Sequence, residues 1–253
     1  MAMQALFDLS GKTAVVTGAN TGIGQGIAVA LAEAGASIVA VGRSSMDETE
    51  ALVANAGSKF HVIKADLGTI KPVKPIVAEA LERFGALDIL INNAGIIRRA
   101  DAIDFTEEDW DAVMNVNLKT AFFLSQAAAR HMLEKGRGKI INIASLLSFQ
   151  GGIRIPSYTA SKSGLAGLTR LLACEWAGKG VNVNAIAPGY FVTNNTTALR
   201  EDADRNASIL ARIPAGRWGE PGDIGGAAVF LASAASDYVH GTVLPVDGGW
   251  LAR

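Results

Sequence analysis

Six short runs rich in valine, isoleucine and leucine recur along the 253-residue chain, and stretches with helical spacing lie between most of them. The runs are largely continuous in apolar residues, which is typical of strands that are buried on both faces. Repeated strand–helix units of this kind predict an α/β fold with a doubly wound parallel sheet, helices on both faces and right-handed crossovers. The predicted strands are residues 12–17, 37–41, 60–65, 87–91, 139–143 and 181–186.

Helices are expected between these strands, at residues 47–56, within 73–84, over 107–134 and over 158–177. A further helix should follow Gly24, because Ile27, Leu31 and Ala34 recur at helical spacing. No linker, charge block or low-complexity segment divides the sequence, so residues 1–253 are predicted to form one domain.

Charge and composition exclude several classes of partner. The 23 lysines and arginines nearly balance 24 aspartates and glutamates, so no overall field favours nucleic acid or an anionic membrane. The start lacks a secretory leader and no apolar run approaches a membrane span, which predicts a cytoplasmic protein. The three histidines lack acidic or cysteine partners at ligand spacing, so no metal site is expected, and the single cysteine, Cys174, is interpreted as a core residue.

A glycine-rich turn follows the first predicted strand, in the segment Gly18-Ala19-Asn20-Thr21-Gly22-Ile23-Gly24. Glycines permit a tight turn and close approach of a ligand, and the free N–H groups of the next helix favour a pyrophosphate. The segment therefore predicts a dinucleotide site, although similar turns also occur without a ligand. Gly18, Asp66, Asn93, Ser145 and Pro188 all come just after predicted strands, so they should meet at the carboxyl edge of the sheet.

Tyr158 and Lys162 are four residues apart at the start of a predicted helix, so their side chains should leave one face together. A cation within about 4 to 6 Å lowers the pKa of an acid by roughly 1 to 3 units, which would make the phenol usable in acid–base catalysis. Ser145 could hydrogen-bond the substrate oxygen whose proton Tyr158 transfers. By itself the pair also fits an amphipathic surface helix.

Six motifs in order and spacing resemble the short-chain dehydrogenase/reductase family over nearly the whole chain. They are Thr17-Gly18-x-x-x-Gly22-x-Gly24, Asn92-Asn93-Ala94-Gly95, Asn117, Ser145, Tyr158-x-x-x-Lys162 and Pro188-Gly189. The resemblance implies a single-domain Rossmann-type fold and an NAD(P)-dependent oxidoreductase that transfers a hydride between a nicotinamide and a secondary alcohol or ketone.

The resemblance also implies roles for individual residues. Tyr158 would be the catalytic acid or base, and Ser145 would position the substrate oxygen. Lys162 would lower the pKa of the tyrosine and hold the nicotinamide ribose, while Asn117 would support a water in a proton relay. Asp66 would reach the adenine, and Thr193 would hold the carboxamide. The implied cofactor-binding residues are Gly18, Asn20, Gly22, Ile23, Gly24, Arg43, Asp66, Leu67, Asn93, Ala94, Gly95, Tyr158, Lys162, Pro188, Gly189 and Thr193.

Arg43 bears on the choice between NADP(H) and NAD(H). Enzymes that prefer NAD usually place an acidic residue at the end of the second strand, where Gly42 stands here, followed by Arg43. A guanidinium pairs bidentately with a phosphate, which slightly favours NADP(H) and leaves NAD(H) possible. Alternatively, Arg43 lies over the adenine or points to solvent.

Segments 141–158, 212–219 and 246–253 are similar to members of this family that act on sugar acids. A sugar acid needs a cation for its carboxylate and polar groups for its hydroxyls. Arg154 is the first candidate for the cation, Arg98 or Arg99 could serve instead, and Gln150 and Asn195 are candidates for hydroxyl contacts, beside Ser145 and Tyr158. A related carbonyl reductase, or a cofactor-binding regulator without catalysis, are the alternatives.

An apolar stripe of Leu165, Leu168, Leu172 and Trp176 suggests more hydrophobic surface than one sheet face covers. The family similarly pairs this helix between subunits. A homotetramer is therefore expected, with residues 250–253 near a subunit contact, although the position of Trp250 also fits a place beside the substrate cleft.

Overall fold

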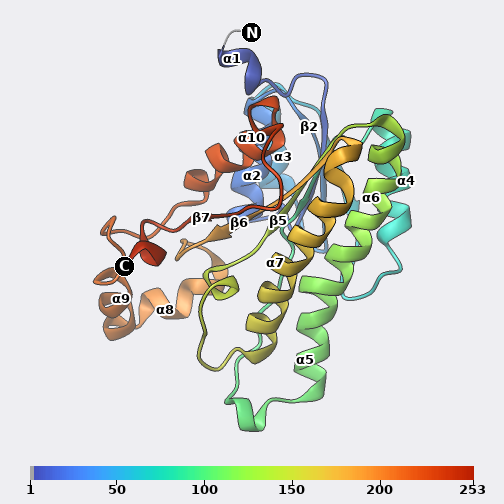
Figure 1. Ribbon diagram of the computed structural model, residues 1–253. Helices are drawn as coiled ribbons and strands as arrows, with labels where there is room; N and C mark the ends of the chain where they lie inside the picture. Colours follow the sequence, from blue (N-terminus) through green and yellow to red (C-terminus); the bar gives the residue numbers. More distant parts are fainter. Residues whose placement is uncertain (1–2) are drawn as a thin grey trace.

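The computed structural model describes residues 3–253 and contains a sheet of seven strands, all parallel, in the order β3-β2-β1-β4-β5-β6-β7 (Figure 1). The strands are β1 Thr13–Thr17, β2 Ser37–Gly42, β3 Phe60–Lys64, β4 Ile89–Asn92, β5 Gly138–Ile143, β6 Val181–Pro188 and β7 Val243–Val246. This arrangement confirms the predicted doubly wound parallel sheet.

Ten α-helices accompany the sheet in residues 3–253: α1 Met3–Leu6, α2 Gly22–Glu33, α3 Asp47–Asn55, α4 Val73–Phe84, α5 Glu107–Met114, α6 Ala121–Lys135, α7 Pro156–Trp176, α8 Thr197–Glu201, α9 Ala203–Leu210 and α10 Gly225–Ala232. None of them is long and apolar enough to cross a membrane.

The strand order fixes where a ligand can bind. β1 pairs with β2 on one side and with β4 on the other, so the chain winds in opposite directions from the centre of the sheet. Crossovers leave a crevice at the carboxyl ends of the strands where the winding reverses. The loops after β1 and β4 therefore border the expected binding crevice.

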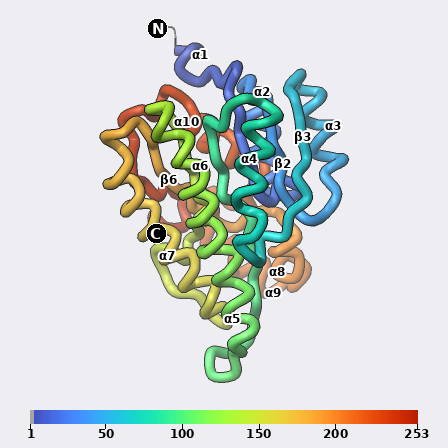
Figure 2. Tube along the Cα trace, turned by 90° about the vertical axis from the view of Figure 1, so that its right-hand side faces the viewer, coloured from blue at the N-terminus to red at the C-terminus, as the bar shows by residue number. Residues whose placement is uncertain are grey.

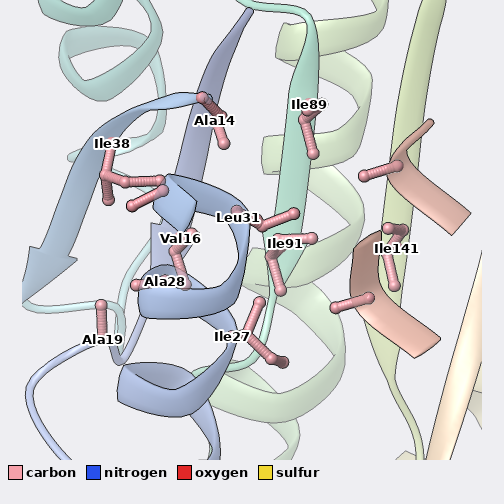
Figure 3. Packing of buried hydrophobic residues seen from close by; sticks show 14 of the residues in the cluster. Ala14, Val16, Ala19, Ile27, Ala28, Leu31, Ile38, Ile89, Ile91 and Ile141 are labelled. Atoms are coloured by element: carbon pink, nitrogen blue, oxygen red, sulfur yellow. The ribbon is translucent and has the colours of Figure 1, made fainter. Parts of the chain in front are cut away.

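Each face of the sheet has its own hydrophobic core. On one face, Ile27 and Leu31 of α2 pack against alternate strand residues such as Val16 and Ile91 (Figure 3). Leu231 of α10 belongs to the same core. On the other face, Ile76, Leu124 and Leu172 contribute from α4, α6 and α7, which run side by side (Figure 2). Because both faces are covered, the strands contain few polar residues, as their sequence indicated.

The structure differs from the expected elements in several places. The short helices α1, α8, α9 and α10 were not predicted. β7 was not predicted, because Val243–Val246 is a four-residue run that contains a proline and lies among glycines. The long helix expected over residues 107–134 is interrupted by the π-helical segment η2, Asn115–Thr120, which separates α5 from α6. A π-helical turn inside an α-helix frequently marks a functional position.

Two expectations about α7 are corrected by burial. Leu165, Leu172 and Trp176 are buried within the subunit's own core, so the apolar stripe is largely covered without a partner. Cys174 is exposed rather than part of the core, because it lies on the side of α7 that faces away from the sheet. Leu171 is the large apolar side chain that α7 exposes most.

Candidate active site

A cavity of about 360 Å³ lies at the carboxyl edge of the sheet, where the winding reverses. It brings together most of the residues proposed for the cofactor and for catalysis, from five separate segments of the chain. Those lining it are Gly18, Asn20, Gly22, Ile23, Gly24, Asn93, Ala94, Gly95, Ser145, Tyr158, Lys162, Pro188, Gly189, Thr193 and Asn195. Thr21, Ile97, Ile143, Ala144, Phe191, Asn194 and Thr196 also line it and were not singled out in the sequence.

The glycine turn is held in shape from β4. Gly18 has a φ of 65°, which favours glycine, and the Asn93 Nδ2 donates to the carbonyl oxygens of Thr17 (2.9 Å) and Gly18 (3.1 Å). A Cβ on Gly24 would lie 2.1 Å from the Gly18 oxygen, so α2 can approach the turn this closely only with glycine there. The turn is therefore a rigid cradle against the helix.

The N-terminus of α2 faces the same cavity through Gly22, Ile23 and Gly24. Thr21, which precedes the helix, makes no side-chain cap to its backbone N–H groups. Uncapped amides at a helix N-terminus bind anions such as phosphate. The glycine cradle and this helix end together fit the pyrophosphate of a dinucleotide.

Thr193 closes the opposite wall of the cavity. A Cβ on Gly22 would lie 3.1 Å from the Thr193 Cγ2, so the loop after β6 touches the glycine turn. Thr193 also caps the 3₁₀ turn η5, Asn194–Thr196, in a reciprocal arrangement with Thr196. The capping fixes the position of Thr193 in the cavity wall.

Lys162 is buried in α7, with an exposed fraction of 3%. Its Nζ donates a hydrogen bond to the Ile143 carbonyl at the end of β5 and lies 5.6 Å from the centroid of the Tyr158 ring. Burial lowers the pKa of Lys162 to about 8, and no carboxylate in residues 3–253 forms an ion pair with it. The site thus holds a buried cation beside the phenol.

The pKa of Tyr158 is raised in the structure, and burial of the phenol is the main cause. A hydrogen bond with Ser145 and the positive charge of Arg99 act in the opposite direction. The expectation that Lys162 alone lowers this pKa therefore omitted the larger effect, which is desolvation of the phenolate. Sequence spacing reveals which groups meet but not how deeply they are buried.

Asn117 lies in η2 and has an exposed fraction of 1%. Its side chain accepts from the Ile96 N–H (2.8 Å) and donates to the Ile96 carbonyl (3.0 Å) and to the Ser161 Oγ (3.4 Å). These contacts connect η2 to the loop after β4 and to α7 next to Lys162. Asn117 therefore lies behind the cavity wall rather than among the residues lining it.

Three residues proposed for the cofactor lie outside this cavity. Arg43 and Asp66 are exposed at the ends of β2 and β3, with 4.0 Å between the Arg43 Nη1 and the Asp66 Oδ1. Leu67 is buried in the core, and its carbonyl accepts from the Thr120 hydroxyl. The two exposed residues border the side of the crevice formed by β2 and β3, where the adenosine end of a dinucleotide would extend.

A second cavity of about 420 Å³ adjoins the first and shares Ser145 and Tyr158 with it. Gln150 and Asn195, both proposed for the substrate, line this cavity, as does Arg99. Arg154 is absent from its wall, because its Nε pairs with the Asp101 Oδ1 at 3.1 Å. Arg98 is likewise paired, with the Asp109 Oδ1 at 3.1 Å.

Sequence reasoning did not single out Arg205 and Arg212, which also line the second cavity. Trp250, for which the sequence allowed either a subunit contact or a place beside the substrate cleft, lies in the wall of the second cavity and is 4% exposed. Arg205 and Arg212 lie sixty and sixty-seven residues after Ser145, so no local pattern in the sequence connects them to it. Within residues 3–253, no group of three or more metal-binding side chains is gathered.

The two cavities together suit a two-substrate reaction. The first offers a phosphate cradle and a buried cation, and the second offers polar and cationic groups. A hydroxyl and a phenol, Ser145 and Tyr158, stand where the cavities meet. This arrangement can hold a substrate oxygen and exchange a proton with it while a dinucleotide occupies the first cavity.

Comparison with known proteins finds relatives that match nearly the whole chain. A family model described as enoyl-(acyl carrier protein) reductase matches residues 18–251. The chain is 59% identical to 2-dehydro-3-deoxy-D-gluconate 5-dehydrogenase of Escherichia coli and 60% identical to that of Dickeya dadantii, each over 98% of both chains. A crystal structure of a gluconate 5-dehydrogenase from Burkholderia cenocepacia in complex with NADP and tartrate is 42% identical, has a TM-score of 0.93 and matches 99% of both chains.

Proposed function

Because the chain belongs to the short-chain dehydrogenase/reductase family, we propose that it is an NAD(P)-dependent oxidoreductase that interconverts the C5 hydroxyl and ketone of 2-dehydro-3-deoxy-D-gluconate. The relatives that are 59% and 60% identical bear the name of this activity. One observation supports it most strongly: Ser145 and Tyr158 stand at the junction of a dinucleotide cradle and a cation-lined cavity.

Each residue of the junction has a defined task in this proposal. A bound nicotinamide cofactor supplies or accepts the hydride. Tyr158 takes the proton from the substrate hydroxyl during oxidation and returns it during reduction, while Ser145 donates a hydrogen bond to the same oxygen. Lys162 favours the phenolate through its buried charge, and Asn117 holds the loop after β4 beside the helix that contains Tyr158.

Several features support the use of NADP(H) in particular. Gly42 ends β2 without an acidic side chain, and Arg43 follows it with an exposed guanidinium. The related gluconate 5-dehydrogenase of Burkholderia cenocepacia is described as a complex with NADP. We therefore expect NADP(H) to bind at least as well as NAD(H).

The remaining cofactor-binding and substrate-binding residues are proposed to have the roles expected from the sequence, except that Arg154 is not assigned to the substrate carboxylate.

The protein is proposed to act in the cytoplasm as a homotetramer. Leu171 on α7 and Trp110 on α5, both partly exposed on neighbouring helices, offer apolar surface for a subunit contact. Light scattering at micromolar concentration tests the assembly, and a monomer would contradict it.

A substrate panel tests the proposed function. Purified protein is mixed with NAD(H) or NADP(H) and with 2-dehydro-3-deoxy-D-gluconate, 2-deoxy-D-gluconate, D-gluconate or a 3-oxoacyl thioester, and reduced nicotinamide is followed by absorbance. We expect the highest kcat/KM with the first two compounds. Preference for D-gluconate or for the thioester would favour a different reductase, and cofactor binding without turnover of any compound would favour a regulator.

A further inference from the structure

The second cavity is positively charged although the whole chain is nearly neutral. Three arginines line it, Arg99, Arg205 and Arg212, and no aspartate or glutamate does so. None of the three forms an ion pair with a carboxylate within residues 3–253. A cleft with charges of one sign concentrates ligands of the opposite sign, so the cavity is suited to an anion.

Arg212 is held in a fixed orientation. Its guanidinium stacks on the indole of Trp250 at 4.0 Å from the ring centroid, and Trp250 in turn contacts Tyr190, with 4.7 Å between ring centroids. The Gln150 Oε1 accepts from both the Arg212 Nη2 (3.4 Å) and the Trp250 Nε1 (3.2 Å). Stacking and hydrogen bonding therefore set both the plane and the rotation of the guanidinium before a ligand arrives.

The same contacts also determine which way Gln150 faces. Its two neighbours are both donors, so the amide oxygen must point toward them and the NH₂ group away from them. No hydrogen bond of this NH₂ group to another part of residues 3–253 accompanies them. Gln150 and Arg212 thus present adjacent free N–H donors, which is what a carboxylate requires.

Arg99 and Arg205 are placed differently. The Arg99 Nη2 donates to the Asn195 carbonyl (3.3 Å), and its charge acts on Tyr158, which places it toward the reacting end. Arg205 is exposed in α9, where its backbone N–H donates to the Asp202 Oδ1 (3.0 Å) and its carbonyl accepts from the Ser208 Oγ (2.9 Å). Of the three, Arg212 alone is stacked on an aromatic ring in the described part of the chain.

We propose that Arg212, positioned by Trp250 and Gln150, binds the substrate carboxylate and thereby selects sugar acids over neutral sugars. The proposal rests on the proposed function, because oxidation at C5 puts the C1 carboxylate four carbon–carbon bonds from the reacting carbon. The anion must then lie beyond Ser145 and Tyr158, in the part of the second cavity that the first does not share. Arg212, Gln150 and Trp250 line that part.

The test compares two ligands in several variants. Steady-state kinetics are measured with 2-dehydro-3-deoxy-D-gluconate and with its neutral amide, for the wild type and for Arg212→Gln. For the acid we expect KM to rise about tenfold to a hundredfold in the variant, with kcat within threefold, since a hydrogen-bonded charge pair is lost. For the amide we expect the same KM in both proteins, because there is no carboxylate to lose.

Further variants separate charge from geometry. Arg212→Lys should recover part of the KM for the acid, because an ammonium keeps the charge but neither the fork nor the stack. Gln150→Leu should raise KM for the acid less than Arg212→Gln does. Arg83→Gln, at an exposed arginine of α4 away from both cavities, makes the same change in net charge and should behave as the wild type.

The possible results are distinguishable. An unchanged KM for the acid in Arg212→Gln, or equal increases for the acid and the amide, would overturn the role of Arg212 while the proposed function stands. If KM for the acid rose selectively in Arg99→Gln and in no other variant, the substrate carboxylate would bind near Tyr158 instead. Failure of the wild type to convert any sugar acid would instead refute the proposed function. Circular dichroism and cofactor affinity, both unchanged in Arg212→Gln, show that the fold is intact.

Discussion

The Lys162 ammonium lies 5.6 Å from the centroid of the Tyr158 ring and donates its hydrogen bond to the Ile143 carbonyl rather than to the phenol. Any effect of Lys162 on the phenol must therefore act through space. Ser145 also lies beside the phenol, and its side chain acts to lower the pKa of Tyr158. In the proposed mechanism these two neighbours of the phenol have different tasks, since Lys162 favours the phenolate through its charge and Ser145 donates a hydrogen bond to the substrate oxygen.

Replacing Tyr158 with phenylalanine removes only this hydroxyl. We expect Tyr158→Phe to lower kcat by at least about a hundredfold, the lower end of what a positioned acid or base contributes. Cofactor affinity should stay within about twofold, because the ring and its packing remain. Stopped-flow turnover and fluorescence titration with NADPH measure the two quantities. A variant that keeps more than a tenth of wild-type activity would contradict the role of Tyr158.

Replacing Lys162 with methionine should stabilise the protein at neutral pH and abolish its activity. The folded-state pKa of about 8 lies below the ordinary value of 10.5, so the buried ammonium destabilises the fold at pH values below 8. Burying the Lys162 ammonium lowers the free energy of unfolding by on the order of 3 kcal/mol at most. Methionine removes this cost but also loses the hydrogen bond to the Ile143 carbonyl, which offsets about 1 kcal/mol of the gain in stability. We expect the free energy of unfolding to increase by about 1 to 2 kcal/mol at pH 7.

The stability difference between Lys162→Met and the wild type should depend on pH. As pH rises from 8 toward 10.5, the unfolded chain keeps a proton that the folded lysine has lost, so the wild type gains stability relative to Lys162→Met. The advantage of the variant should therefore shrink between pH 8 and pH 10. Urea denaturation at pH 7, 8.5 and 9.5 measures it. A variant less stable than the wild type at pH 7 would show that the hydrogen bond outweighs desolvation.

Much of the fold was predictable because the local patterns are strong. The six predicted strands are continuous apolar runs, and the glycine turn and Tyr158-x-x-x-Lys162 have spacings with direct geometric meaning. Strand β7 was missed because a four-residue run with Pro245 gives little signal, and the interruption at Asn115–Thr120 was missed because no glycine or proline marks it in the sequence. In both cases tertiary contacts, not propensity, determine the structure.

The residues of the substrate cavity were harder to predict, because the partners of a long, charged side chain depend on tertiary contacts. Arg154 is four residues before Tyr158 and was the first candidate for the carboxylate, yet it pairs with Asp101. Arg212 is fifty-four residues after Tyr158 and lies in the cavity because Trp250, near the end of the chain, supports it. No periodic signal in the sequence connects Gln150, Arg212 and Trp250.

The close contact of α2 with the glycine turn leads to a further prediction. A Cβ on Gly24 would lie 2.1 Å from the Gly18 oxygen and 2.4 Å from the Asn93 Nδ2, both part of the cradle. Gly24→Ala should therefore cost about 2 kcal/mol or more of stability and weaken cofactor binding, as overpacking does. Gly178→Ala is the matched control, since no atom lies within 4 Å of its Cβ position. Thermal unfolding with and without NADPH compares them, and equal behaviour would contradict the cradle.

Arg43 provides the last prediction, which concerns the phosphate of the cofactor. Its side chain is 69% exposed and its contact with Asp66, at 4.0 Å, is an exposed pair that contributes little to stability. The guanidinium is thus free to turn toward a 2′-phosphate, and Gly42 offers no carboxylate to repel one. We expect Arg43→Ala to weaken NADP(H) binding by roughly 1.5 to 3 kcal/mol, the range for a hydrogen bond to a charged group, and NAD(H) binding by less than about 0.5 kcal/mol. Calorimetry with both cofactors at equal salt measures the difference, with Arg83→Ala as the control for net charge. A strong preference of the wild type for NAD(H), or unchanged NADP(H) affinity in Arg43→Ala, would contradict this role, because either result requires that Arg43 does not contact the phosphate.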